Sequence, residues 1–91
     1  MLLSALLRKA KIEYNGADQE ISRVICDSRA AEAGALFVCI TGFASDGHAY
    51  AERAYALGCR AFLAEKPLDL PPDAVVVLQD NTRKALAKVS A

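Results

Sequence analysis

The stretch ALFVCIT, residues 35 to 41, has no polar side chain before Thr41 and decides the fold class. Its β-branched and aromatic residues favour a strand, and a strand without polar alternation is typical of a sheet that is covered on both faces. Similar apolar runs occur at 60–64 (RAFLA), at 74–78 (AVVVL) and around Ile21, Val24, Ile25 and Cys26. Each run is a predicted strand.

Helical spacing marks both ends of the chain. Leucines at positions 2, 3, 6 and 7 share one face of a predicted first helix, which ends before the turn residues Asn15 and Gly16. Near the other end, apolar residues share one side of a helix predicted over 82–90, with Asp80 or Asn81 as its N-cap.

A further helix is predicted between the second and third strands, over 48–57. Asp46 is a suitable N-cap for it, and Gly58 stands where a helix commonly ends in glycine. The segment between Glu65 and Asp73 holds all three prolines and is predicted to be a loop.

Strands that alternate with helices at short spacing predict an α/β fold, a small sandwich with a mostly parallel sheet flanked by helices. A chain of 91 residues suffices for a single domain. Ligands of such sheets bind at the edge where strand ends and helix starts gather.

Composition excludes several classes of function. Eleven basic and eleven acidic residues cancel, so we expect no binding to nucleic acid or to a membrane surface. The cysteines, at 26, 39 and 59, are odd in number and widely spaced, which argues against a disulfide framework and a zinc site. The apolar start is short for a signal peptide and its positive charges follow it. We therefore expect a cytoplasmic protein without a metal site, with Cys26 and Cys39 as small buried groups.

The triplet Asp27, Ser28 and Arg29 follows a predicted strand directly, at the position where open α/β sheets place binding residues. A serine hydroxyl and backbone groups there suit a small polar ligand. The alternative is a turn in which Asp27 and Ser28 bond their own backbone, and the triplet alone favours this turn.

The loop TGFASDG, residues 41–47, leaves a buried strand and enters a predicted helix. Its Gly42 and Gly47 let the backbone approach a ligand, and N–H groups at a helix start suit an anionic or carbonyl-bearing ligand. The loop is neither GxGxxG nor a phosphate loop, so an ordinary turn explains it equally well.

The remaining titratable residues give no catalytic set. His48 has no nucleophile at an evident spacing and is interpreted as structural. Five carboxylates form no acid and base pair and are assigned to a solvated surface: Asp18, Glu20, Glu32, Glu52 and Glu65.

Taken together, DSR (27–29), GALFVCITG (34–42) and SDGHAYAERAYALGCRAFLAE (45–65) resemble, in order and spacing, the N-terminal domain of the Mur ligases of bacterial cell-wall synthesis. The end of the chain, VVVLQDNTRKALAKVSA (75–91), is similar to the strand and helix that precede the family's ATP-binding domain. The likeness is greatest to members that add the third residue of the peptidoglycan stem peptide, meso-diaminopimelate or L-lysine. Members that add D-Ala-D-Ala are the close alternative.

In such ligases the first domain binds the UDP part of the nucleotide-sugar substrate, here UDP-N-acetylmuramoyl-L-alanyl-D-glutamate. ATP and magnesium belong to a central domain, whose phosphate loop would begin beyond residue 91, and the incoming amino acid belongs to a C-terminal domain. The resemblance implies that residues 1–91 are one domain of a longer ligase, with no catalytic residue and no activity alone.

Carried over position by position, the resemblance assigns UDP-sugar contacts to Cys26, through its backbone, and to Ser28, Phe43, Ala44 and Ser45, with Asp27, Arg29, Asp46, Gly47 and His48 in support. Phe43 and Ala44 stand where such ligases often have polar residues, so backbone contacts and packing of Phe43 on the base are expected. Two other hypotheses are a non-catalytic module that meets the missing domains or another cell-wall protein, and, less favoured, an enzyme using His48 or a cysteine.

Overall fold

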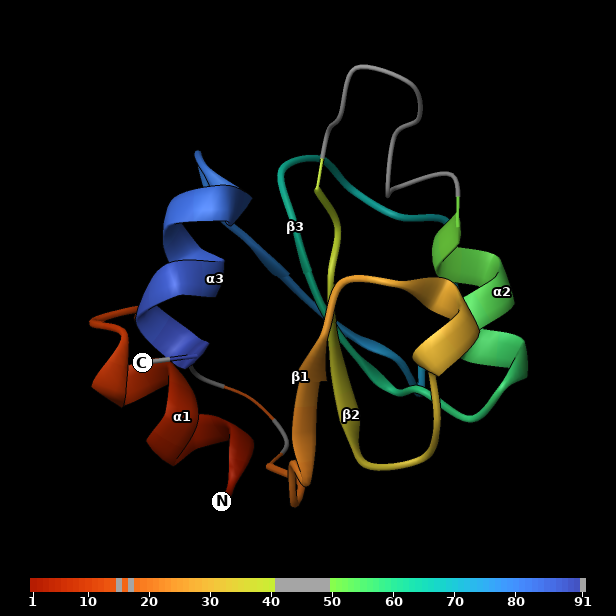
Figure 1. Cartoon of the computed structure of the whole chain (residues 1–91), viewed down its shortest axis with the longest axis horizontal. Coiled ribbons are helices and arrows are strands. Elements are labelled where there is room, and N and C mark those ends of the chain that lie inside the picture. Colours follow the sequence, from red (N-terminus) through yellow and green to blue (C-terminus); the bar gives the residue numbers. More distant parts are fainter. Residues whose placement is uncertain (15, 17, 41–49, 91) are drawn as a thin grey trace.

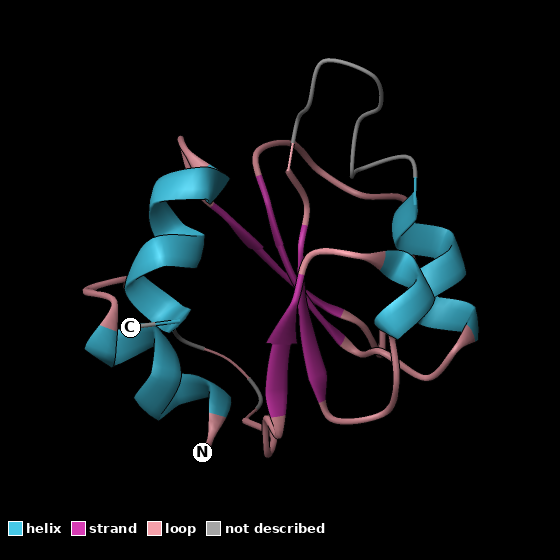
Figure 2. Ribbon diagram, viewed as in Figure 1, coloured by secondary structure: helices cyan, strands magenta, loops and turns pink. Residues whose placement is uncertain are grey.

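The computed structural model describes residues 1–14, 16, 18–40 and 50–90. Its elements, in chain order, are α1 (Leu3–Lys9), β1 (Arg23–Ile25), the 3₁₀ turn η1 (Ser28–Ala30), β2 (Ala35–Val38), α2 (Ala51–Ala56), β3 (Ala61–Ala64), β4 (Val75–Leu78) and α3 (Thr82–Ser90). Within these described residues the strands form one parallel sheet in the order β1-β2-β3-β4 (Figure 2). The predicted α/β fold with a parallel sheet is confirmed.

The sheet separates two helical layers. Figure 1 shows α1 and α3 on one face and α2 with η1 on the other. Parallel strands that follow one another across a sheet need right-handed crossovers, and these all pass over the same face. Here η1, α2 and the proline loop, through Leu68 and Leu70, all pack on the α2 face. The opposite face is therefore covered by the two terminal helices.

Alternate residues of each central strand pack against the two helical layers, because successive side chains of a strand point to opposite faces of the sheet. In β3, Leu63 belongs to the core cluster under α1 and α3, and Phe62 to the cluster under α2. Every residue of β2 and β3 is buried, as their unbroken apolar composition predicts. Phe37 and Phe62 are register partners whose ring centroids lie 6.0 Å apart.

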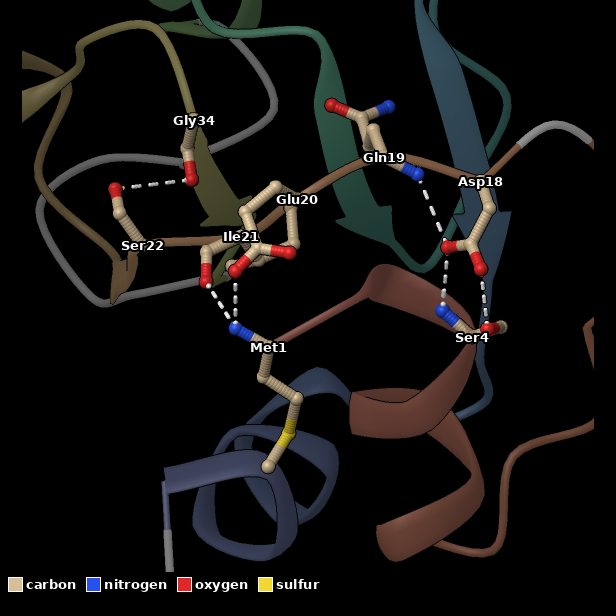
Figure 3. Close-up of polar contacts among 8 residues, drawn as sticks. All are labelled: Met1, Ser4, Asp18, Gln19, Glu20, Ile21, Ser22 and Gly34. Carbon is tan, nitrogen blue, oxygen red and sulfur yellow. Dashed lines mark hydrogen bonds and ion pairs between the residues drawn. The ribbon is translucent and has the colours of Figure 1, made fainter.

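Helix α1 receives its N-terminal cap from another segment of the chain. Leu2, the residue before the helix, offers no capping side chain. The Asp18 carboxylate instead accepts hydrogen bonds from the backbone N–H of Ser4, at 2.9 Å, and from its hydroxyl (Figure 3). Nearby, the amino group of Met1 contacts the Glu20 carboxylate at 2.8 Å. Assigning Asp18 to a solvated surface was therefore incomplete, because this exposed carboxylate also caps a helix.

Helices α1 and α2 end in backbone conformations with positive φ. Lys11, with φ of 60°, follows α1, and Ile12 donates its N–H to the Leu7 carbonyl. Gly58, with φ of 110°, follows α2 and confirms the predicted glycine terminus. The start predicted for this helix, with Asp46 as cap, lies outside the described residues.

The last helix and the proline loop agree with the sequence. Helix α3 begins after Asn81, whose side-chain oxygen accepts a hydrogen bond from the N–H of Lys84 at 3.0 Å. The loop before β4 is tied to α2 by Asp73, which accepts hydrogen bonds from the Tyr55 hydroxyl and from Arg60 Nε. Arg60 also lies over the Tyr55 ring, 3.8 Å from its centroid.

Candidate functional site

The carboxyl ends of the strands define one edge of the sheet. Because the described strands are parallel, the chain leaves all of them at this edge. Residues 26–30 follow β1 there, and α3 starts there after β4. Polar groups that follow strand ends are therefore brought together by the topology, as in other open α/β sheets.

The triplet after β1 is folded on itself. Asp27 Oδ1 accepts a hydrogen bond from the backbone N–H of Arg29 at 2.9 Å, and the Asp27 carbonyl accepts one from Ala30 at 3.0 Å. The Arg29 side chain returns to the same carboxylate, with Nε at 3.2 Å and the terminal nitrogen at 2.9 Å. The turn predicted from the residue types is thus present, closed by Asp27.

These bonds leave Asp27 and Arg29 electrostatically satisfied by one another. The pKa of Asp27 is held below its ordinary value by hydrogen bonds from the Arg29 side chain and backbone, and the pKa of Arg29 is raised by the same pair. Both side chains are exposed. Their geometry suits a positioning role, fixing the backbone from Cys26 to Arg29, better than direct use in proton transfer.

The cysteines divide into one exposed and two buried thiols. Cys39 and Cys59 are fully buried. Cys59 donates its S–H to the Ala35 carbonyl at 3.2 Å, and burial raises the pKa of its thiol. Cys26 is exposed, which corrects the expectation that it is buried. Cys26 follows Ile25, the buried last residue of β1, and therefore lies outside the strand.

A partly buried network ties the ends of β2 and β3 to the start of α3. The Thr82 hydroxyl lies 2.7 Å from the carbonyl oxygen of Cys39 and 3.1 Å from Glu65 Oε2. Glu65 Oε2 also accepts the backbone N–H of Thr82 at 2.9 Å. The predicted surface position of Glu65 agrees with its exposure, but its bonds to Thr82 were not predicted. The available signal was an acidic residue directly after a buried strand.

The structure thus brings together four of the ten predicted site residues. Cys26 and the triplet of residues 27–29 lie at the end of β1, next to β2 in the sheet. The other predicted site residues lie outside the described residues: Phe43, Ala44, Ser45, Asp46, Gly47 and His48. Their distance from the triplet remains a prediction.

The described residues include neither a metal-binding cluster nor a phosphate loop. No group of three or more His, Cys, Asp or Glu side chains among them is arranged to hold a metal ion. The sequence contains no GxxxxGK[ST] loop to cradle phosphates. In the part of the chain that the structure describes, no helix is long and apolar enough to cross a membrane.

A hollow of about 710 Å³ lies beside α1 and is lined by Ser4, Arg8, Lys11, Ile12, Glu13 and Tyr14. None of these residues belongs to the triplet or to the strand ends. Volume alone therefore does not make it the functional site, and the polar edge after β1 and β2 is the better candidate.

The chain is similar in sequence to known ligases. Residues 20–91 match the model of the "Mur ligase family, catalytic domain". The UDP-N-acetylmuramoyl-L-alanyl-D-glutamate–2,6-diaminopimelate ligase of Syntrophomonas wolfei is 41% identical over the whole chain, which covers 19% of that protein. The ligase of the same name from Clostridium botulinum is 43% identical, with 100% of this chain and 20% of the relative covered.

Solved structures that superpose on the chain include MurF ligases. A crystal structure of MurF from Acinetobacter baumannii superposes with a TM-score of 0.76 and 27% identity, over 94% of this chain and 19% of that one. MurF from Thermotoga maritima, in complex with ADP, gives a TM-score of 0.66 and 26% identity over 75% of this chain and 16% of that one. The chain spans about a fifth of the length of the relatives that it matches over its whole length.

Proposed function

The chain belongs to the Mur ligase family, and we propose that it is the domain with which a MurE-type ligase holds the UDP end of UDP-N-acetylmuramoyl-L-alanyl-D-glutamate. The observation that carries this proposal is the 41% identity, over the whole chain, to a ligase named for that substrate and for 2,6-diaminopimelate. The reaction would add the third amino acid of the peptidoglycan stem peptide. The incoming residue is then meso-diaminopimelate, rather than the L-lysine that the chain's own residues equally allow.

In this proposal the 91 residues are one domain of a longer enzyme and do not catalyse ligation alone. The central domain would hold ATP and Mg²⁺, and ATP would supply the phosphoryl group that activates the substrate carboxylate, so that the incoming amine displaces phosphate. The 91-residue domain contributes affinity and orientation by anchoring the UDP end of the substrate. Such an enzyme works in the cytoplasm, in peptidoglycan synthesis, and so supports cell shape and division.

The binding edge uses the turn after β1 as a rigid platform. The bonds between Asp27 and Arg29 hold the backbone of residues 26–29 in one conformation. We assign contacts with the UDP-sugar to the backbone of Cys26 and to Ser28. Phe43, with Ala44 and Ser45, would surround the uridine, and Phe43 would pack on the base.

A MurF-type ligase, which adds D-Ala-D-Ala, is the second candidate. It is favoured by the solved structures, since the MurF chains superpose with TM-scores up to 0.76. Their sequence identity to this chain is 27%, against 41% for the diaminopimelate ligase, so the MurE type is the better supported. A non-catalytic interaction module is the remaining alternative.

Ligand titration tests the binding role directly. We expect UDP and UDP-N-acetylmuramoyl-dipeptide to bind the folded domain weakly in calorimetry and to shift the amide signals of residues 26–30. Ser28→Ala should weaken binding about tenfold or more, the effect of removing a hydrogen bond to a charged ligand. Ser22→Ala, before β1 at the opposite end of that strand, is the matched control and should bind as the parent does.

A folded sample that shows no signal with millimolar UDP would contradict the binding role and favour the interaction module. The amino acid is tested with the complete enzyme that contains this domain. Incorporation of diaminopimelate into the UDP-dipeptide supports the MurE type, and incorporation of D-Ala-D-Ala into the UDP-tripeptide supports MurF.

A further inference from the structure

Thr82 is the one polar residue that is fully buried among the residues the structure describes. It is the first residue of α3, and its hydroxyl lies 2.7 Å from the Cys39 carbonyl oxygen, 43 positions away in the chain. A buried hydroxyl is costly unless it is hydrogen-bonded, so this contact is a required part of the fold at that position.

The hydroxyl has a single proton, and the Cys39 carbonyl can only accept one. The shorter contact therefore assigns the proton to Cys39, and the Glu65 carboxylate takes the backbone N–H of Thr82 at 2.9 Å. Helix α3 does not need this hydroxyl as a cap, because the Asn81 side chain already accepts the N–H of Lys84. The Thr82 hydroxyl therefore bonds the end of β2 and does not cap its own helix.

Both sides of Cys39 are consequently held by different elements. Its N–H donates to the Leu63 carbonyl of β3 at 2.8 Å, and its carbonyl accepts the hydroxyl from α3. Cys39 lies one residue past β2, and the chain continues through Ile40 toward residues 43–45. On the other side, β2 pairs with β1, whose end carries the triplet of residues 27–29.

We propose that Thr82 is a positioning residue of the UDP-binding edge: its hydroxyl fixes the carboxyl end of β2, beside the end of β1 that carries residues 27–29, and Glu65 anchors the backbone of Thr82. This inference rests on the proposed function. It assigns to the first turn of α3 a role in substrate binding, although no atom of α3 needs to touch the substrate.

The test compares variants of Thr82 that differ only in the hydroxyl. Thr82→Val keeps the shape of the side chain and removes the hydroxyl that lies 2.7 Å from the Cys39 carbonyl oxygen, whereas Thr82→Ser keeps the hydroxyl. Val89→Ala is the control, because Val89 is buried in the same helix, in its last turn. UDP affinity is measured for each variant by NMR titration, at a temperature where circular dichroism shows the sample fully folded.

We expect Thr82→Val to weaken UDP binding about tenfold, as for the loss of a net hydrogen bond. Thr82→Ser should restore affinity to within about threefold of the parent, and Val89→Ala should leave it unchanged while lowering stability. If the Thr82 hydroxyl contributed to stability alone, neither Thr82→Val nor Val89→Ala would weaken UDP binding at a temperature where both variants are folded. Affinity that stays at the parental value in Thr82→Val, or that falls equally in Val89→Ala, overturns the inference.

Glu65→Ala provides a second test should Thr82→Val not fold. It removes the acceptor of the Thr82 N–H and leaves the buried hydroxyl contact in place, so a smaller loss of about threefold is expected. Parental affinity in Glu65→Ala would overturn the anchoring role of Glu65 and with it the proposed network. A parent domain that is folded and does not bind UDP contradicts the proposed function itself, so the two failures are distinct.

Discussion

The two helical layers cover the same sheet with different side chains. Under α1 and α3 the core consists mainly of leucine, isoleucine and valine, contributed by both helices and by the strands. Under α2 the helix contributes only small buried residues, Ala51 and Ala54, and the bulk comes from the sheet through Phe37 and Phe62. We call the first the aliphatic layer. We call the second the thin layer, because the buried residues of its helix α2 are both alanines.

The two layers differ in what they contribute to stability and to binding. The thin layer contains η1, which lies against α2 and carries part of the proposed site (Figure 1). Short elements with small contact residues bury less apolar area, so they contribute less to stability per residue. The aliphatic layer can hold the sheet in place while the thin layer presents polar turns to the ligand.

The largest expected effect distinguishes the layers at two adjacent positions of β3. Phe62 and Leu63 are both fully buried and face opposite layers. Phe62→Ala should lower the free energy of unfolding by about 4 kcal/mol and Leu63→Ala by about 3 kcal/mol, in line with buried aromatic and leucine truncations. The aromatic change costs more because Phe37 also loses its ring partner. Urea unfolding measures both, and a larger loss for Leu63→Ala would show that the thin layer depends less on its aromatic pair than we infer.

A smaller loss is expected where α2 ends. Gly58 has φ of 110°, and an added Cβ would lie 3.1 Å from the backbone nitrogen of Ala33. Gly58→Ala should therefore cost about 1–3 kcal/mol of unfolding free energy, through strain in the left-handed region and contact with backbone. Leu57→Ala, at an exposed neighbour, should change stability by about 0.5 kcal/mol or less. Equal urea midpoints for both variants would contradict a tight fit of α2 against the segment before β2.

The features of the fold that the sequence predicts are those with a local cause. Apolar runs without alternation located the strands, and the order of strands and helices indicated a parallel sheet. The start of α3 after Asn81 and the glycine end of α2 also follow from nearby residue types. The turn after β1 could be predicted because Asp27 bonds the backbone two residues on, within its own segment.

The contacts that sequence reasoning missed join residues far apart in the chain. Asp18 caps a helix that begins 15 positions earlier in the sequence, at Leu3, and Thr82 bonds a carbonyl 43 residues away. Hydrophobic periodicity does not reveal such pairs, because they depend on which distant segments the fold brings together. For the candidate site the same holds: residue types marked the triplet, but the exposure of Cys26 depends on where the cover over β1 stops.

At the end of α1, a substitution should raise the free energy of unfolding instead of lowering it. Lys11 has φ of 60°, a conformation in which glycine is favoured. Lys11→Gly should stabilise the domain by about 1 kcal/mol, because it relieves left-handed strain. Ala5→Gly, inside the same helix, is the matched control and should destabilise by about 1 kcal/mol. If Lys11→Gly is also destabilising, contacts of the lysine side chain outweigh the backbone strain.

The smallest expected effect concerns the cap of α1 and its dependence on pH. The pKa of Asp18 lies below its ordinary value, chiefly because the hydroxyl and backbone N–H of Ser4 donate to the charged carboxylate. The folded state therefore binds fewer protons than the unfolded state as the pH falls through this range. The stabilisation is complete above the unfolded pKa and is lost as the pH falls through the lower, folded pKa.

Asp18→Asn should consequently lower the urea midpoint at neutral pH and have little effect at acidic pH, so that the curves of parent and variant converge as the pH falls. Asp73→Asn is the matched comparison in the thin layer, since the pKa of Asp73 is also lowered, mainly by the Tyr55 hydroxyl. Both carboxylates are exposed, and solvent weakens both interactions. Asp18 also supplies a helix cap, which Asp73 does not, so the neutral-pH loss should be greater for Asp18→Asn. Equal losses would mean that the cap on the aliphatic layer adds nothing beyond a surface hydrogen bond.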